Sequence, residues 1–111
     1  MNQYDVYLAD LNPTIGREQF GKRPVLIISN NYENLLDVVT IIPITSLKKG
    51  RKIYPNELLL ADELEVPSIL LCQQIRTISK KRLIKKLTSI DNYITQKKIV
   101  DILCLRFEDM D

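Results

Sequence analysis

The sequence predicts a mainly β fold with one C-terminal helix, arranged as a small, partly open antiparallel β-barrel. Roughly five to seven short segments rich in β-branched residues follow one another between turn residues. The connections between them are short enough for antiparallel pairing. A clear helical repeat of apolar residues occurs only after Asp91. The length of 111 residues, with 45% hydrophobic and 27% charged residues, fits one folded domain over residues 1–111.

The first expected strand alternates between apolar and polar residues, and the third is rich in β-branched residues. The expected strands are Tyr4–Asp10, Val25–Ser29, Val38–Thr45, Glu57–Leu60, Ser68–Thr77 and Ile84–Ile90. Pro24 lacks a backbone donor and therefore fits the first position of the second strand. Pro43 interrupts the third strand and predicts an edge position or a bulge there. The fifth strand changes from apolar to polar along its central residues, ILLCQQI.

Helical segments are expected only in the last third of the chain. Ser79 is expected to cap a single helical turn over Lys80–Leu83. Asp91 is expected to cap the C-terminal helix, which runs to about Glu108. Residues at three- and four-residue intervals predict the apolar face of this helix, and they are Val100, Leu103, Cys104 and Phe107.

The composition excludes several classes of function. With no histidine and two cysteines, the chain cannot form an imidazole acid–base pair or a four-ligand zinc site. It also lacks a Gly-rich phosphate loop and carboxylates at metal spacing, so we expect no metal and no other cofactor. Cys72 and Cys104 lie in apolar segments and are expected to be buried thiols. The apolar runs are far shorter than the roughly 18 residues that cross a bilayer, and the N-terminus lacks a secretion signal, so we expect a cytoplasmic protein without membrane contact.

Positive charge gathers in two clusters, although the net charge is only +2. Leu47–Ile53 reads LKKGRKI and Lys80–Lys86 reads KKRLIKK. Each cluster alone is typical of a solvated charged surface. If both lay on one face, they would form an electrostatic track for a phosphate backbone.

Polar residues also gather at the expected strand ends. These residues are Glu18, Gln19, Arg23, Thr45, Ser46, Gln73, Gln74 and Arg76. If the second and third strands form an antiparallel hairpin, Arg23 and Thr45 lie side by side. A guanidinium fork and a hydroxyl are donors suited to a phosphate that gains charge during phosphoryl transfer. The alternative is that Arg23 pairs with Glu18 and that Thr45 simply ends a strand.

Three stretches of the sequence resemble the MazF/PemK family of bacterial toxins, which are the ribonuclease halves of toxin–antitoxin pairs. They are DVYLADLNPTIGREQFGKRPVLIISN (Asp5–Asn30), IIPITS (Ile41–Ser46) and ILLCQQIRTISKKRL (Ile69–Leu83). They follow the family's order and spacing, and the resemblance covers nearly the whole chain. It implies an SH3-like barrel of the CcdB-PemK-like kind, a homodimer, and neutralisation by a separate, acidic MazE-like antitoxin that covers Arg23.

The resemblance also implies metal-independent, sequence-specific cleavage of single-stranded RNA. The ribose 2′-OH would attack the adjacent phosphate and leave 2′,3′-cyclic phosphate and 5′-OH ends. The family's essential arginine and threonine match Arg23 and Thr45, with Gln74 and Ser46 in support. Glu18 is the candidate for polarising the 2′-OH, and orienting Arg23 is its alternative role. The expected RNA-binding residues are Arg17, Gln19, Phe20, Lys48, Lys49, Arg51, Lys52 and Arg76.

The sequence departs from the family pattern at two informative positions. Gln73 stands where many members have an acid, and an amide cannot act as a base. Phe20 replaces a small residue, and it would stack on an RNA base or contact a second subunit. The loop Ser46–Asn56 is expected to order or move on binding RNA or antitoxin. Two other functions remain open: a CcdB-like gyrase poison that acts through its terminal helix, and a nucleic-acid-binding module without catalysis.

Overall fold

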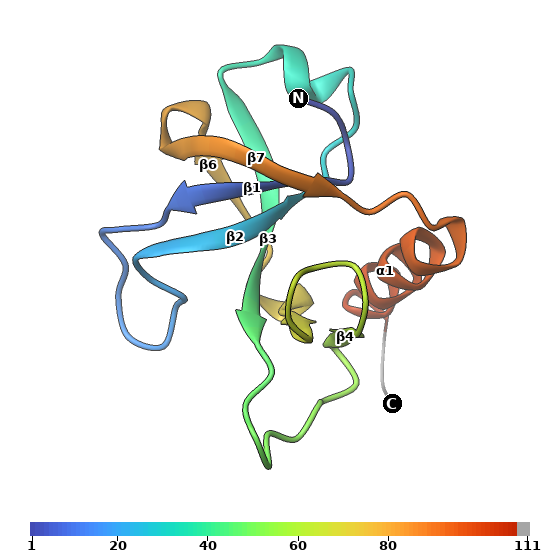
Figure 1. Cartoon of the computed structure of the whole chain (residues 1–111). Coiled ribbons are helices and arrows are strands. Elements are labelled where there is room, and N and C mark those ends of the chain that lie inside the picture. The colour runs from blue at the N-terminus through green and yellow to red at the C-terminus, as the bar shows by residue number, and fades with distance from the viewer. Residues whose placement is uncertain (109–111) are drawn as a thin grey trace.

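The computed structural model describes residues 1–108, so the last three residues of the expected 1–111 domain lie outside it. Within the described residues, seven strands, three 3₁₀ turns and one α-helix follow one another (Figure 1). In chain order they are β1 (Asp5–Asp10), β2 (Lys22–Ile27), η1 (Glu33–Leu35), β3 (Val38–Ser46), β4 (Leu58–Leu60), β5 (Ser68–Leu70), η2 (Cys72–Gln74), β6 (Arg76–Ser79), η3 (Lys80–Arg82), β7 (Leu83–Ser89) and α1 (Tyr93–Leu105). The predicted mainly β fold with a C-terminal helix is therefore confirmed.

The long strand β3 joins the two parts of the sheet. The strand order is β4-β5-β3-β2-β1-β7, and β6 also pairs with β3. All of these pairs are antiparallel, as predicted. Figure 1 shows β3 running from the upper strands down toward β4. Among residues 1–108, β4 and β7 end the order without pairing with each other, so the sheet is a partly open barrel.

Pro43 lies where β3 changes partners. Pairing with β6 ends at Ile41, and pairing with β5 begins at Ile44. The carbonyl of Pro43 still accepts a hydrogen bond from the Leu71 N–H at 3.0 Å. Because proline lacks an N–H, it is tolerated at this junction, where neither ladder needs a donor. The predicted interruption of the strand at Pro43 is thus a change of partner.

The expected strand Ser68–Thr77 is wrong, because the chain divides there into β5, η2 and β6. Both strands pair with β3, β5 with its end and β6 with its beginning. The chain must therefore turn to follow β3 past Pro43. The 3₁₀ turn makes this step, and Gln74 N–H donates to the carbonyl of Leu71 at 2.9 Å. The change from apolar to polar residues in ILLCQQI marks this turn.

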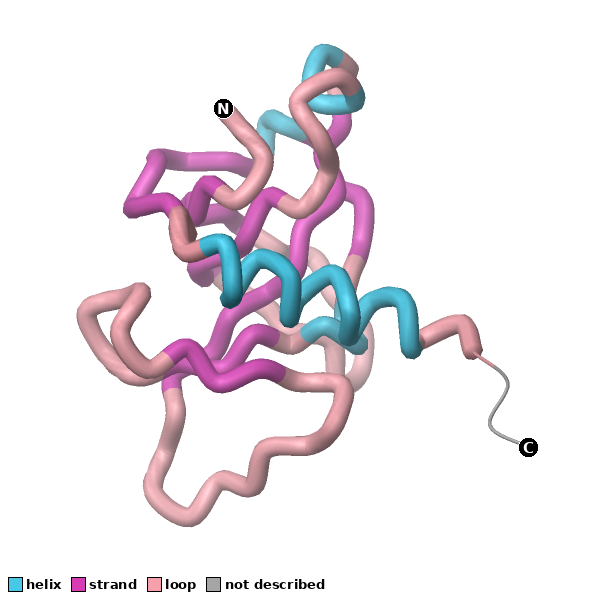
Figure 2. Tube along the Cα trace, turned by 90° about the vertical axis from the view of Figure 1, so that its right-hand side faces the viewer, coloured by secondary structure: helices cyan, strands magenta, loops and turns pink. Residues whose placement is uncertain are grey.

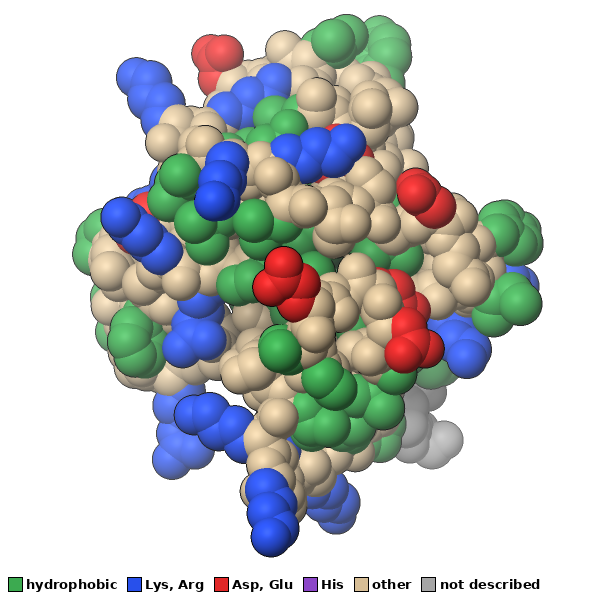
Figure 3. Space-filling view, viewed as in Figure 1, with side chains coloured by type: hydrophobic (Ala, Val, Ile, Leu, Met, Phe, Trp, Pro, Cys, Tyr) green, Lys and Arg blue, Asp and Glu red, His purple; other side chains and the backbone are tan. Residues whose placement is uncertain are grey.

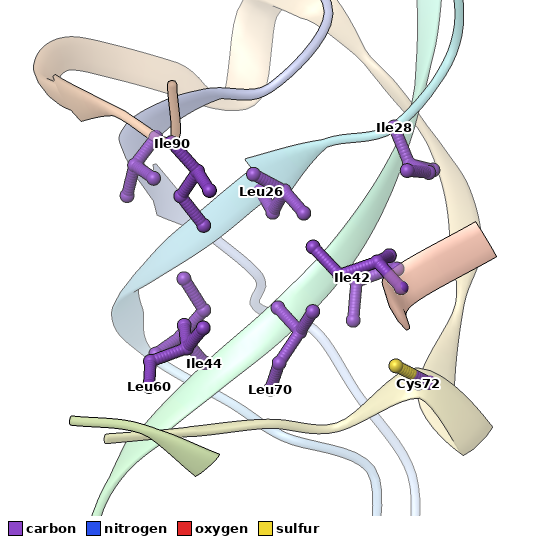
Figure 4. Packing of buried hydrophobic residues seen from close by; sticks show 10 residues of the cluster. Leu26, Ile28, Ile42, Ile44, Leu60, Leu70, Cys72 and Ile90 are labelled. Atoms are coloured by element: carbon purple, nitrogen blue, oxygen red, sulfur yellow. The ribbon is translucent and has the colours of Figure 1, made fainter. Parts of the chain in front are cut away.

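Two apolar clusters occupy opposite faces of the sheet, because successive side chains of a strand point to opposite sides. Along β2, Leu26 enters the first cluster, whereas Val25 and Ile27 enter the second. Figure 4 shows the side chains of the first cluster pointing toward one another. Its members are Val6, Leu26, Ile28, Ile42, Ile44, Leu60, Leu70, Cys72, Ile90 and Ile99. The second cluster comprises Ala9, Leu11, Val25, Ile27, Val39, Ile41 and Ile78.

Figure 2 shows helix α1 lying across the strands, and its residues Ile99, Ile102 and Leu103 pack with the first cluster. Its buried side is formed by Ile99, with Ile102 and Leu103 packed beside it. The predicted apolar face was therefore wrong except at Leu103, since the other three predicted members, Val100, Cys104 and Phe107, are exposed. Apolar residues occur on both sides of this helix, so the same spacing fits two faces offset by one residue. Within residues 1–108, α1 is too short and too polar to cross a membrane.

Two local capping predictions have different outcomes. The Ser79 hydroxyl accepts a hydrogen bond from the Lys81 N–H at 3.2 Å and caps η3, as predicted. The cap of α1 is Asn92 rather than Asp91. Its side-chain oxygen accepts from the N–H groups of Ile94 and Thr95 at 2.9 and 3.2 Å. Asp and Asn are both common N-cap residues. Asn92 takes this role because it is the residue with extended backbone directly before the first helical residue.

Candidate active site

Three polar side chains extend from one face of the sheet at the ends of β2, β3 and β6. The last β2–β3 pair is Val25 with Pro43, and continuing this register by two residues places Arg23 opposite Thr45. The antiparallel hairpin expected from the sequence is therefore present. Because Ile42 and Ile44 both enter the first cluster, the alternation of β3 continues through Pro43. Arg23 and Thr45 accordingly lie on the face of the second cluster.

Arg76 belongs to the same face. It pairs across the β3–β6 ladder with Ile41, a member of the second cluster. Directly opposed residues of neighbouring strands point to the same side of a sheet. Arginines from two strands and a threonine from a third thus share one surface, which is an arrangement suited to binding an anion.

Arg23 is held by the loop that precedes it. Its side-chain Nε–H donates to the carbonyl of Phe20 at 2.9 Å. The guanidinium carbon lies 5.5 Å from the centroid of the Phe20 ring, within the range of a cation–π contact. The arginine itself is half-buried, whereas the Phe20 side chain is exposed. One N–H of the guanidinium is used in this bond, and the terminal nitrogens carry the remaining donors.

Glu18 pairs with Arg76 and not with Arg23, which corrects the alternative drawn from the sequence. Glu18 Oε2 lies 3.6 Å from Arg76 Nη1, and Glu18 Oε1 accepts a hydrogen bond from the Ile15 N–H at 3.2 Å. About half of the Glu18 side chain (51%) is exposed, so solvent weakens this ion pair. Arg76 Nη1 is nevertheless buried and has no hydrogen-bond partner among the described residues. The pair holds both charged groups on the candidate site.

The β1–β2 loop, residues 11–21, contacts η2 through Gln19, close to the end of the loop. The Gln19 N–H donates to Oε1 of Gln74 at 2.9 Å. This bond brings Gln74, expected to support catalysis, against the loop that carries Glu18. The side-chain oxygen of Gln19 is buried without a hydrogen-bond partner in residues 1–108. Arg17, also expected to bind RNA, is exposed on the same loop.

Glu57 is a buried acid that the sequence did not single out. Only 1% of its side chain is exposed, and it accepts hydrogen bonds from both terminal nitrogens of Arg51 at 2.8 and 2.9 Å. Gln73 Nε2 donates to it at 2.8 Å and the Tyr54 N–H at 3.1 Å. The pKa of Glu57 is lowered to about 2, chiefly by the hydrogen bonds from Arg51. Burial raises this pKa, and the hydrogen bonds from Gln73 and Tyr54 lower it further. The only signal in the sequence is a lone acid between a basic loop and an apolar strand.

The β3–β4 loop, residues 47–57, therefore contains two kinds of cation. Arg51 holds the loop to Glu57, whereas Lys48, Lys49 and Lys52 are exposed. Lys52 Nζ lies 5.5 Å from the centroid of the Tyr54 ring. Ser46, at the end of β3, is also exposed.

The two basic clusters lie at opposite ends of the molecule. Figures 1 and 2 place the β3–β4 loop at the lower end of the molecule and η3 in its upper part. Figure 3 shows Lys and Arg side chains projecting from that lower tip and others spread over the upper half. In one chain the clusters therefore form two separate basic regions. Among residues 1–108, no three His, Cys, Asp or Glu side chains are grouped closely enough to hold a metal ion.

Fold and site together define a class of protein: a small, partly open antiparallel β-barrel with arginine and threonine donors for an anion on one face. The sequence profile of the PemK-like, MazF-like toxins of type II toxin–antitoxin systems matches residues 2–103. The chain belongs to this family.

Two relatives carry names that describe an activity. Endoribonuclease EndoA of Bacillus subtilis strain 168 is 36% identical over 96 residues, which cover 84% of this chain and 83% of that protein. Endoribonuclease MazF of Staphylococcus saprophyticus is 36% identical over 105 residues, which cover 92% of this chain and 84% of that protein. Both comparisons span most of the two chains, so they include the site as well as the core.

Solved structures show the same fold. MazF from Deinococcus radiodurans superposes with a TM-score of 0.80 at 24% identity and covers 96% of this chain and 94% of that one. A mycobacterial endoribonuclease in complex with its cognate antitoxin superposes with a TM-score of 0.78 at 23% identity, over 98% of both chains. At these identities the likeness concerns the barrel and its helix.

Proposed function

We propose that this chain is a toxin that cuts single-stranded RNA at short sequence motifs without a metal ion, as one domain over residues 1–111. The observation that carries the proposal is the shared face of Arg23, Thr45 and Arg76, formed by three strand ends. The relatives named as endoribonucleases support the reaction class. A phosphate bound beside Arg23 and Thr45 would meet a guanidinium group and a hydroxyl, and Arg76 adds a second positive charge to this face, opposite Ile41.

The proposed reaction uses the RNA's own ribose as nucleophile. The 2′-oxygen forms a bond to the adjacent phosphorus, and the bond from phosphorus to the 5′-oxygen of the next nucleotide breaks. The 2′-OH passes its proton toward the Glu18 carboxylate, the departing 5′-oxygen takes one from the side of Arg23, and proton exchange with water restores both groups. The products are a 2′,3′-cyclic phosphate and a 5′-OH, so neither a metal nor histidine is required by this chemistry.

The residues divide into three roles. Arg23 stabilises the phosphorane, whose negative charge is greatest in the transition state, and supplies a proton toward the leaving oxygen. Thr45 donates a hydrogen bond to a phosphate oxygen, with Ser46 and Gln74 in support. Glu18 polarises the 2′-OH, since it is the carboxylate that Arg76 holds at this face.

Two loops bind the RNA on either side of the reacting phosphate. The β1–β2 loop contributes Arg17, Gln19 and Phe20, and the exposed Phe20 ring stacks on a base. The β3–β4 loop contributes the exposed Lys48, Lys49 and Lys52, which contact phosphates. Arg51 acts through its ion pair with Glu57, which holds this loop in place.

The proposal includes two protein partners. A separate acidic, MazE-like antitoxin neutralises the toxin by covering Arg23, and the solved complex of a mycobacterial relative with its cognate antitoxin supports this part. The second partner is another copy of the chain in a homodimer. Exposed apolar residues on α1 and just after it, including Val100 and Phe107, support an interface between subunits. The toxin acts in the cytoplasm, where its RNA substrates are.

The direct test is to incubate the purified protein in EDTA with a long single-stranded RNA and sequence the fragment ends. Discrete cuts with cyclic phosphate and 5′-OH ends are expected, and Arg23→Ala should abolish them. Lys22→Ala is the matched control, because Lys22 is the exposed neighbour on the same strand. Intact RNA across varied sequences would reject the proposal. Inhibition of DNA supercoiling by gyrase would then identify a CcdB-like poison. Salt-dependent RNA binding without cleavage would identify a binding module.

A further inference from the structure

Arg82 differs from the other cations of the Lys80–Lys86 cluster. It lies in η3 and is half-buried, whereas its neighbour Lys81 is exposed. Arg82 Nη1 donates to the carbonyl of Asp10 at 3.2 Å and also to the carbonyl of Asn12. These carbonyls stand at the point where β1 ends and the β1–β2 loop begins. A residue expected in a solvated basic run therefore holds the start of the loop that carries the candidate site.

The start of this loop is in turn bonded to its end. The side-chain oxygen of Asn12 accepts a hydrogen bond from the Gly21 N–H at 3.0 Å. The Leu11 N–H donates to the carbonyl of Gly21 at 2.9 Å. Gly21 has a φ of +73°, a conformation that glycine adopts without steric penalty. These bonds join Leu11 and Asn12 to Gly21, and we call this junction the neck of the loop. It lies two residues before Arg23.

The neck connects Arg82 to Arg23 through contiguous contacts. Arg82 fixes Asn12, Asn12 fixes Gly21, and Arg23 bonds back to the carbonyl of Phe20 within the same loop. The loop is also bonded to η2, through the hydrogen bond from the Gln19 N–H to Gln74. Loss of the Arg82 contacts would leave the bonds of Gly21 to Leu11 and Asn12 in place but no longer fixed to η3, so that Arg23 could shift with them.

We propose that Arg82 is a positioning residue: it anchors the neck of the β1–β2 loop to η3 and so sets the direction of Arg23 at the reacting phosphate, without touching RNA. This inference rests on the proposed ribonuclease activity. An arginine suits the role because its N–H groups have a fixed, planar geometry that can reach two carbonyls at once. A lysine can donate to one or both, but without that fixed geometry.

The role predicts a specific kinetic change. A shift of about 1 Å in a catalytic group can reduce the rate up to roughly a hundredfold, whereas substrate binding through the other loops would remain. We expect Arg82→Gln to lower kcat about tenfold or more while KM stays within about twofold. Arg82→Lys should recover part of the loss. Lys81→Gln, which removes the neighbouring exposed charge, should leave kcat unchanged.

A phosphate-contacting role for Arg82 would give a different result. It would raise KM and reduce the salt dependence of RNA binding by about one unit of slope. That outcome, or full activity of Arg82→Gln, would overturn the proposal. Asn12→Ala offers a second route, because it breaks the neck at the next contact and should reproduce the loss in kcat without removing any charge.

Amide hydrogen exchange tests the same link independently of RNA cleavage. Arg82→Gln should accelerate exchange at the Gly21 and Leu11 N–H groups at least tenfold, and Lys81→Gln should not. Unchanged exchange in Arg82→Gln would overturn the positioning role even if the enzyme is active. If the wild-type protein cut no RNA, the proposed function would fail, while the exchange data would still decide whether Arg82 holds the loop.

Discussion

Arg51 and Glu57 form a bidentate ion pair, with the two guanidinium nitrogens 2.8 and 2.9 Å from the two carboxylate oxygens. The pair spans the β3–β4 loop and closes it against the start of β4. Gln73 of η2 also donates to Glu57, and the adjacent Gln74 accepts from the β1–β2 loop. One buried carboxylate thus joins the basic loop to the turn that supports the candidate site.

Removing the charge of Glu57 should destabilise the protein. Glu57→Gln leaves Arg51 without its anionic partner at a site where the acid is almost fully buried. We expect the free energy of unfolding to fall by about 3 kcal/mol. This is the lower end of the range for a broken buried ion pair, because Arg51 still reaches solvent. Urea unfolding measures the change, and Glu65→Gln is the control, since Glu65 is exposed. Equal stability of the two variants would contradict the structural role of the pair.

The same acid should make stability depend on pH. The pKa of Glu57 is lowered to about 2 in the folded protein, below its ordinary value of 4.5. The unfolded chain therefore binds more protons between these values, so the contribution of Glu57 is full above pH 4.5 and is lost as the pH falls toward 2. Over this pH range the free energy of unfolding should fall by on the order of 2–3 kcal/mol through Glu57.

Comparison of the wild type with Glu57→Gln isolates this effect from the other carboxylates. Unfolding free energies measured from pH 6 to pH 3 should converge for the two proteins as the pH falls. A constant difference over that range would show that Glu57 does not titrate as an ion-paired group.

Local sequence patterns were sufficient for most of the sheet. The alternation in β1 and the β-branched run of β3 predict their strands because a half-buried strand has a period of two. The division of the expected strand Ser68–Thr77 was missed, because it depends on where β3 changes partners and no local pattern records that. The buried side of α1 was missed because apolar residues occupy both sides of the helix.

At the candidate site, too, the contacts set by strand pairing were predictable from the sequence, whereas those made by loops were not. An antiparallel hairpin of β2 and β3 was expected, and its register, continued from the pair Val25–Pro43, brings Arg23 opposite Thr45. The sequence alternative paired Glu18 with Arg23, whereas Glu18 pairs with Arg76, because that contact depends on how the β1–β2 loop folds against β6. The ion pair of Arg51 with Glu57 was not predicted. Arg82 shows this most strongly, because its acceptors are 70 and 72 residues away in sequence.

The two cysteines should differ in reactivity, contrary to the expectation that both are buried. Cys72 is buried, and burial raises the pKa of its thiol to about 11, so little thiolate forms at neutral pH. Cys104 is exposed on α1. Titration with a thiol reagent should modify Cys104 in the native protein and Cys72 only on unfolding. Cys104→Ser should then show no fast phase, and two fast thiols in the wild type would contradict the burial of Cys72.

The hydroxyl of Thr45 should matter more than its shape. Thr45 is half-buried at the end of β3, where a β-branched side chain suits the strand. Thr45→Val keeps that shape and removes the donor to phosphate, so single-turnover RNA cleavage should fall about a hundredfold or more. Thr45→Ser keeps the hydroxyl and should lose far less. Because both variants retain the strand, similar thermal unfolding is the control, and full activity of Thr45→Val would exclude Thr45 from the reaction.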